Sequence, residues 1–486
     1  MNPHSQPLTN ENRLCLGIGL AIFASVLQEI YYFKPQVIYV SVVFLAVVSY
    51  ILGEAMAFVL PSRGPLGRFL NPGPFNSKEH AGVVIMASAA AANAVSTEIL
   101  AAQKLYYNED PSPGAAIFLV IAAQLLGYGI AGLLRGTLVQ PTKMLWPINL
   151  PVNTLLETLH RDKKENKFRL KIFYVIFAVM FVWEVLPEYM FPVLTGVSVF
   201  CLAKQNSMVF TNLFGGSQGN EGLGLLSLSL DWQYIAGLWS PLWVPLQTLT
   251  NSYIGYLSCM VLFMALYYSN TWRSQDFPFL SQLLYDSSSN STSFAPYNIS
   301  SILTPNNEID STKLQAAGIP WLTGTYVGYL ITTNMGLTAT FVHMFLWNYD
   351  DVKAGWSFAS LENLKKISHH SNWMFWKEGK CKEQRKIEIL KDEDIDPHYK
   401  LMVDYDEVPQ WWYGMVLLTS FSVGLGTLYA VGSTLPWWGY VIANILSAIM
   451  ILFFGAQMAM TGFQFNQQPL VQMLAGYIHP GKPLGT

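Results

Sequence analysis

The sequence predicts an all-α fold, a polytopic integral membrane helical bundle of about ten transmembrane helices with one re-entrant segment. Only 12% of the residues are charged, about half the share of a soluble domain, and 52% are hydrophobic. The charges are crowded into a few loops and are absent from long stretches between them. This distribution indicates a membrane protein more clearly than the average composition does.

A helix needs about 20 mostly apolar residues to cross a bilayer. That rule gives candidate helices at 14–33, 37–60, 81–103, 115–139, 172–191, 195–214, 241–268, 322–346, 412–430 and 437–460. The run 222–238 is apolar but short and Gly-rich, which suits a re-entrant segment enclosed by protein or by a water-filled cavity. The chain therefore divides into a cytosolic N-terminus (1–13), eight helices (14–346), a cytosolic loop (347–410) and two final helices (411–486).

The loop charges predict an orientation. Loop 141–171 carries seven Lys and Arg residues and loop 347–410 carries ten, whereas loop 269–320 carries only two. By the positive-inside rule the first two loops are cytosolic and the third is extracytosolic. Counting crossings places the N-terminus in the cytosol, provided that 195–214, or an equivalent odd number of segments between 171 and 269, crosses the membrane. Two glycosylation sequons, at Asn290 and Asn298, both fall in the loop predicted to lie outside.

Several function classes are disfavoured. The net charge of -3 argues against a nucleic-acid partner, which needs a basic surface. The four cysteines are far apart and form neither a metal-ligand spacing nor a disulfide framework. The sequence contains no Walker phosphate loop, nucleophile elbow, zinc-binding His pair or haem motif. We therefore expect that the protein is not an enzyme and uses no metal and no cofactor. Any transport would be driven by an ion gradient or would be passive.

The most distinctive segment runs from residue 71 to residue 80. It contains, in order, Asn71, Pro72, Gly73, Pro74, Phe75, Asn76, Ser77, Lys78, Glu79 and His80. The prolines and the glycine prevent a regular helix, while Asn76 or Ser77 can cap the helix that follows. The segment is either a capped cytosolic turn with solvated charges or a gate whose ionisable residues enter a polar cavity.

The helix predicted at 81–103 is rich in alanine, which favours close packing against other helices. Asn93 and Thr97 share one face of it, with Glu98 further along. Polar side chains inside a bilayer are costly and usually face a cavity or a partner helix. These three residues are candidates for the lining of a substrate or proton pathway, with helix packing as the alternative.

Further polar or flexible positions complete the candidate pathway. Glu184 is an acid inside an apolar helix, and the following Pro187 frees backbone carbonyls that could help to hold a proton or cation. The Gly-rich segment after Asn212 exposes backbone groups that can bind a ligand in a broken helix, or it is a mobile loop. The other candidates are Gln124, Gly215, Gly216, Glu221 and Asn334.

The string NPGPFNSKEH at 71–80 resembles the signature of the oligopeptide transporter family, and further matches run to the end of the chain. They include QLLGYG at 124–129, MLWPIN at 144–149, VPQWWY at 408–413 and GYIHPGKP at 476–483. The resemblance covers residues 7–486 and is closest in style to fungal members.

This resemblance implies a proton-coupled secondary-active transporter of small oligopeptides such as tetrapeptides, pentapeptides or glutathione-like peptides. The implied partners are the peptide, protons and the lipid bilayer, and the implied location is the plasma membrane, with internal membranes as an alternative. Transport of metal–chelator complexes, as in the yellow stripe-like branch, is a second hypothesis. Family members typically continue with several more helices, so we also consider a truncated chain that acts as a non-transporting membrane scaffold.

Overall fold

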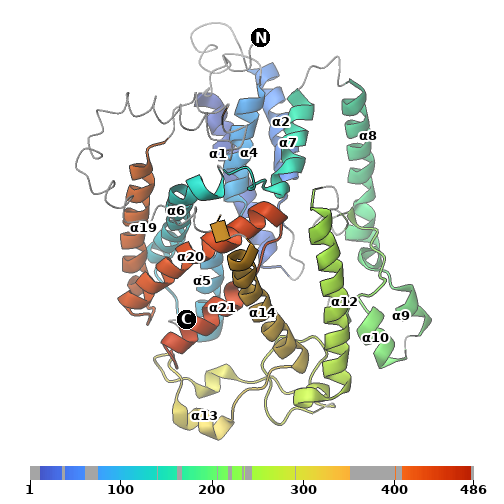
Figure 1. Ribbon diagram of the computed structural model, residues 1–486, viewed down its shortest axis with the longest axis vertical. Coiled ribbons are helices and arrows are strands. Elements are labelled where there is room, and N and C mark those ends of the chain that lie inside the picture. Colours follow the sequence, from blue (N-terminus) through green and yellow to red (C-terminus); the bar gives the residue numbers. More distant parts are fainter. Residues whose placement is uncertain are drawn as a thin grey trace. The chain divides into compact units, whose positions relative to one another are not determined.

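The structure is a computed structural model that describes only part of the chain. With the side chains of 11–14 and 410 excepted, the described residues are 11–34, 39–60, 75–92, 94–139, 141–160, 167–204, 206–216, 222–232, 235, 243–290, 292–347, 349–350, 400 and 408–482. These residues form helices and turns, with isolated β-bridges and no named strand, which confirms the all-α fold (Figure 1). They divide into two compact units, one from 1–95, 148–192 and 231–237, the other from the remaining segments.

The first unit packs α1 (Glu11–Tyr32), α2 (Val42–Val59) and α4 (Ser77–Ala90) against one another (Figure 1). Their shared core includes the fully buried Ala24, Leu45 and Ala87. Small side chains allow membrane helices to approach closely, so alanine at these positions serves packing. A second cluster joins α2 to α7 (Leu150–His160) and α8 (Lys167–Trp183) through Tyr50, Phe75 and Leu159.

The second unit is centred on the contact between α6 (Pro113–Leu138), α14 (Gly324–Trp347) and α20 (Trp437–Thr461). Its further helices are α5 (Val95–Tyr107), α9 (Val199–Ala203), α10 (Met208–Phe214), α12 (Leu246–Tyr268), α13 (Ser311–Ala317), α19 (Gln410–Ala430) and α21 (Gln468–Ile478). The α6 backbone runs against α19, where a Cβ at Gly129 would lie 2.9 Å from the Cα of Leu417.

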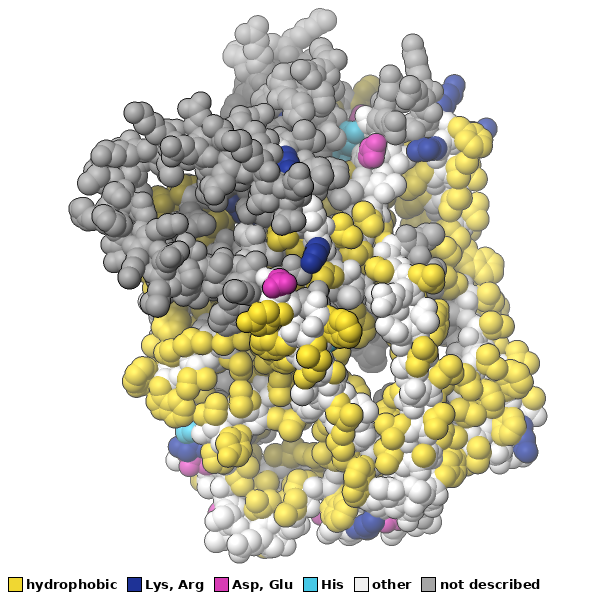
Figure 2. All heavy atoms as spheres, in the orientation of Figure 1, with side chains coloured by type: hydrophobic (Ala, Val, Ile, Leu, Met, Phe, Trp, Pro, Cys, Tyr) yellow, Lys and Arg dark blue, Asp and Glu magenta, His cyan; other side chains and the backbone are white. Residues whose placement is uncertain are grey.

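Eight of the described helices are long and apolar enough to span a membrane. They are Cys15–Tyr32, Val42–Val59, Ser77–Tyr107, Pro113–Leu138, Lys167–Met190, Leu246–Tyr268, Trp411–Ala430 and Trp437–Thr461. The helix α14, predicted at 322–346, is 24 residues long and is not among these eight. Many large hydrophobic side chains are exposed on the described helices and are spread over the face seen in Figure 2, as expected of helices that face lipid.

The prediction of a single membrane-spanning helix at 195–214 is wrong. The chain forms two short helices there, α9 and α10, and Val197 instead exchanges backbone hydrogen bonds of 2.8 Å with Leu228. Lys204 ends α9, and its charge interrupts the apolar run. In the predicted re-entrant run 222–238, the described residues are mostly turns and extended chain rather than a helix.

The helix predicted at 81–103 is also interrupted. It is divided into α4, which ends at Ala90, and α5, which begins at Val95. Ala91 caps α4 by donating its N–H to the Ala87 carbonyl at 2.9 Å. Alanine is the best helix former, so intrinsic propensity does not explain this break. Asn93, the polar residue predicted to share a face with Thr97, lies outside the described residues.

The loop 269–320 has a core of its own. The guanidinium of Arg273 donates to Asp276 at 2.8 Å and to the Ser289 carbonyl at 3.0 Å, and it lies 5.1 Å from the Trp321 ring centroid. The backbone N–H and the side chain of Ser288 donate hydrogen bonds that hold the pKa of Asp286 below its usual range. Asn290 and Asn298 are both exposed, which makes their amides accessible.

Replacing Gly129 by Ala should destabilise the contact between α6 and α19, because the new Cβ meets the Leu417 backbone rather than a flexible side chain. We expect a loss of roughly 1–3 kcal/mol, measured as a lower apparent melting temperature of the purified protein. Gly127→Ala is the matched control, since nothing lies within 4 Å of its Cβ position. Equal melting temperatures of the two variants would contradict this packing.

Asn290 and Asn298 should carry N-glycans if loop 269–320 is extracytosolic. We expect a gel mobility shift that a deglycosylating enzyme removes and that is absent from the Asn290→Gln/Asn298→Gln double variant. Thr292→Ser keeps the first sequon and should keep its glycan, whereas Thr292→Ala should lose it. A chain from a glycosylating host with no glycan at either site would argue against the predicted orientation.

Candidate functional site

The segment that the sequence singled out forms the start of α4. Asn76 is the N-cap of this helix: its Oδ1 accepts the Glu79 N–H at 2.9 Å, and Glu79 Oε2 accepts the Asn76 N–H at 3.3 Å. This reciprocal capping box satisfies N–H groups that have no partner within the helix. Glu79 is buried and Lys78 is half-buried. The predicted cap is confirmed, while Asn71, Pro72, Gly73 and Pro74 lie outside the described residues.

Phe75 anchors this segment on α2. Its ring is buried and occupies the space beside Gly53, where a Cβ would lie 2.5 Å from the ring. Because Gly53 has no side chain, the Phe75 ring can pack directly against the backbone of α2. The position of the α4 N-terminus thus depends on a residue far from the motif in sequence.

The last residue of the motif, His80, is fully buried and contacts another histidine. Its Nδ1 lies 2.8 Å from Nε2 of His160, at the end of α7, and its Nε2 lies 2.8 Å from the carbonyl oxygen of Ala46 on α2. The rings of Tyr50 and Phe75 surround both imidazoles, with ring centroids 5.3–5.8 Å from theirs. The motif therefore joins α2 and α7 through one hydrogen-bonded histidine.

Two carboxyl groups meet where α8 ends. The Glu184 carboxylate accepts the Trp232 backbone N–H at 3.0 Å, and its side chain hydrogen-bonds to that of Asp231. Asp231 is fully buried, and Glu188, in the π-helix Leu186–Met190, interacts electrostatically with it. Two carboxyl groups in contact repel one another when both are ionised.

The described ends of the Gly-rich segment in the second unit, 212–216 and 222–225, lie in close backbone contact. Gly215 caps α10, and a Cβ at Gly215 or at Gly222 would collide with the Thr211 carbonyl oxygen. The N–H of Gly224 donates to the Gly215 carbonyl at 2.9 Å, while that of Gly222 reaches the Gly216 carbonyl at 3.4 Å. These glycines permit a close backbone crossing. Glu221 lies outside the described residues.

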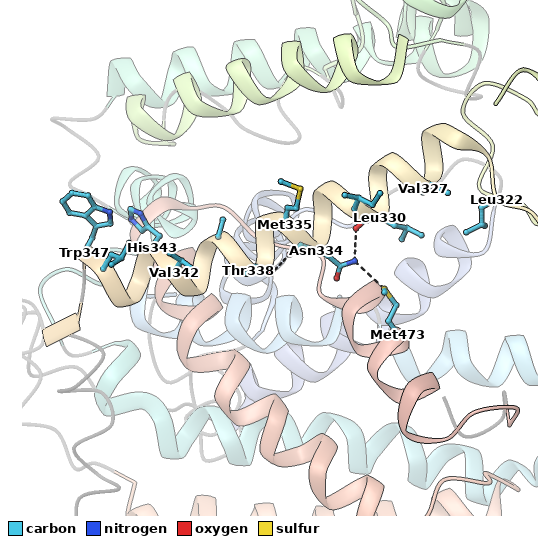
Figure 3. Close-up of a pocket in the computed structure, with 13 residues that line it drawn as sticks. Leu322, Val327, Leu330, Asn334, Met335, Thr338, Val342, His343, Trp347 and Met473 are labelled. Carbon is cyan, nitrogen blue, oxygen red and sulfur yellow. Dashed lines mark hydrogen bonds between the residues drawn. The ribbon is translucent and has the colours of Figure 1, made fainter. Parts of the chain in front are cut away.

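A groove of about 880 Å³ runs along one face of α14 in the second unit (Figure 3). Its lining is mostly apolar, and Asn334 is a polar group at its centre. The Asn334 amide donates to the Leu330 carbonyl at 2.8 Å and lies 3.5 Å from Met473 Sδ, while its Oδ1 is buried without a hydrogen-bond partner. An apolar groove with a few polar groups, here Asn334, Thr338 and His343, has the character of a small-molecule site.

The remaining predicted residues lie apart from these contacts. Gln124 is on an exposed face of α6, and Thr97 and Glu98 are half-buried in the first turn of α5. The candidate residues thus fall into separate groups in two units rather than into one described cavity. Among the described residues, no group of three His, Cys, Asp or Glu side chains could hold a metal ion.

Sequence reasoning missed two residues of these groups. Asp231 is the only charged residue between 222 and 272, and a lone acid in such an apolar stretch could have identified it. His160 follows a regular amphipathic pattern next to a run of basic residues, so no sequence signal distinguishes it from a solvated histidine.

Comparisons with known proteins give matches that cover nearly the whole chain. A family model described as OPT oligopeptide transporter protein matches residues 13–486. Oligopeptide transporter 1 of Arabidopsis thaliana is 32% identical over 485 residues, which cover 97% of this chain and 60% of that protein. The sexual differentiation process protein isp4 of Schizosaccharomyces pombe is 29% identical over 494 residues, 99% of this chain and 58% of that protein. The chain thus spans about three fifths of these relatives, and no solved structure matches it.

Replacing Asn76 by Ala should remove the N-cap of α4 and cost about 1 kcal/mol of stability. Asn76→Ser is the matched control, because a serine hydroxyl can accept the same N–H. The two variants would be compared by the apparent melting temperature of the purified protein. An alanine variant as stable as the serine variant would show that the capping box does not stabilise the helix start.

Proposed function

Because the chain belongs to the oligopeptide transporter family, we propose that it takes part in proton-coupled, secondary-active transport of small oligopeptides across a membrane. The proposed substrates are peptides of four or five residues or glutathione-like peptides. The sequence contains no nucleotide-binding motif, so the proton gradient is the proposed source of energy. We place the protein in the plasma membrane with a cytosolic N-terminus.

The observation that carries the proton-coupling part of this proposal is the contact between Glu184 and Asp231. Asp231 is buried and Glu184 is half-buried, and two ionised carboxylates in contact are costly in a low-dielectric environment, so a bound proton would lower that cost. Proton occupancy can therefore change the relative free energies of two conformations if the pair is more exposed to water in one of them. This is the property that coupling to a proton gradient requires.

Two features support transport of a polar solute in particular. The membrane helix over 77–107 is interrupted between Ala90 and Val95, and non-helical backbone at membrane depth is tolerated only where protein or a water-filled cavity encloses it. The groove along α14 presents Asn334 among apolar side chains. An amide can donate to and accept from a peptide backbone, and apolar walls tolerate varied side chains.

Uptake of a labelled tetrapeptide and of labelled glutathione tests the proposal in cells that lack their own peptide carriers. We expect accumulation against a gradient at pH 5 that is weaker at pH 7. Glu184→Gln should reduce this accumulation about tenfold, which corresponds to about 1.4 kcal/mol of lost coupling. Passive exchange of peptide across the membrane should continue in this variant, because the substrate contacts are unchanged.

Glu29→Gln is the matched control, since Glu29 is a half-buried acid near the end of α1. Its uptake should equal that of the unsubstituted protein at each pH, with equal protein abundance in the membrane. Transport of a metal chelate but of neither peptide would favour the related metal–chelator function. Cells that accumulate none of these substrates would support a non-transporting scaffold.

A further inference from the structure

The contacts of His80 determine where its protons lie. A backbone carbonyl only accepts hydrogen bonds, so His80 Nε2 must carry the hydrogen that it donates to Ala46. In a neutral imidazole the other nitrogen, Nδ1, is then without hydrogen and acts as an acceptor. The partner at 2.8 Å must therefore be the donor, and His160 Nε2 carries the bridging hydrogen.

This arrangement can accept one additional proton and no more. The added proton can go to Nδ1 of His160 while the hydrogen between the two rings stays in place. The bridging hydrogen can then move from His160 Nε2 to His80 Nδ1, so that the positive charge lies on His80 and His160 Nε2 becomes the acceptor of the same bridge. A second added proton would place two N–H groups against each other at 2.8 Å and two positive charges on adjacent rings. Both effects disfavour that state strongly.

The surroundings can stabilise a single positive charge. Tyr50 and Phe75 have ring centroids 5.5 and 5.7 Å from that of His160, within the range of about 6 Å over which aromatic rings attract cations. His160 is half-buried, so the pair reaches partly toward solvent, whereas His80 is fully buried. A proton can therefore arrive through His160 and be shared with the buried ring.

Other ionisable groups occur on every described helix that packs around the pair. They are Tyr50 and Glu54 on α2, Lys78 and Glu79 on α4, Glu157 on α7, and Lys167, Arg169, Lys171 and Tyr174 on α8. The Glu79 carboxylate accepts the Asn76 N–H in the capping box, and Glu157 and Lys167 are exposed. Of these groups, only Tyr50 has ring contacts with both imidazoles in the described structure.

We propose that His80 and His160 form a binding site for a single proton. Binding or release of this proton changes the hydrogen bonds that join the start of α4 to α2 and α7. The inference rests on the proposed proton-coupled function and adds a second proton site to it, at the motif itself. In the uncharged form one hydrogen bridges the rings in a defined direction. In the charged form Nδ1 of His160 carries a hydrogen, so this atom changes from an acceptor to a donor toward its other neighbours.

Proton binding can be measured directly in the purified protein with ¹⁵N-labelled histidine. Scalar coupling across the N–H···N hydrogen bond would identify the two imidazoles among the 8 histidines without any substitution. Between about pH 8 and pH 4 we expect the coupled pair to take up one proton and to keep its coupling. A pair that takes up two protons and loses the coupling would overturn the inference, as would a pair that takes up none.

Transport provides the second measurement. We expect His160→Gln to bring the ratio of peptide uptake at pH 5 to that at pH 7 close to one. His80→Gln should do the same, and the double variant should be no worse than either single variant, because both act through one proton. His370→Gln, in the charged loop outside the described residues, is the control and should keep the normal ratio. A normal ratio in His160→Gln, at normal abundance in the membrane, would overturn the inference.

The two measurements also separate this inference from the proposed function. If the unsubstituted protein takes up no peptide at any pH, the transport proposal fails while the spectra still decide whether the pair binds one proton. If uptake is proton-dependent but the spectra show no protonation of the pair, the function stands and the inference fails.

Discussion

A polar group inside a bilayer must find its partner within the protein, and this constraint shapes the described structure more than any other. Where no water is present, each N–H or carbonyl that leaves a helix costs several kcal/mol unless another group pairs with it. The capping box at Asn76 and Glu79 meets that need at the start of α4. The hydrogen bond from Trp232 to Glu184 meets it where the chain passes α8. In both places a carboxylate accepts from backbone N–H groups that no helix satisfies.

The same constraint explains the contacts of the buried acids and histidine of the described residues, Glu79, His80 and Asp231, which all lie in the first unit. His80 is accompanied by His160, Asp231 by the half-buried Glu184, and Glu79 accepts the N–H of Asn76. The His80–His160 and Glu184–Asp231 contacts each join segments distant in sequence. Such contacts offset part of the cost of burial.

An element could be predicted from the sequence when the residues that determine it are close together along the chain, and could not when they are far apart. Helices such as α2 and α20 were predictable because length and hydropathy are local properties, and the N-cap at Asn76 was predictable because its partner is three residues away. The failure at 195–214 has a different cause. Val197 pairs with Leu228, and no local pattern reports so distant a backbone contact. Composition likewise gave no reason for the helix to stop at Ala90.

The position of the motif depends on Gly53, a residue outside it. A side chain at this position would displace the Phe75 ring, and with it the residue that precedes the cap of α4. In a saturation scan, position 53 should therefore be as intolerant of replacement as the motif itself, although its surroundings in the sequence are those of an ordinary apolar helix. The motif is thus part of a spatial cluster that also includes Gly53 and His160, and the ten-residue string is the part of that cluster that is contiguous in sequence.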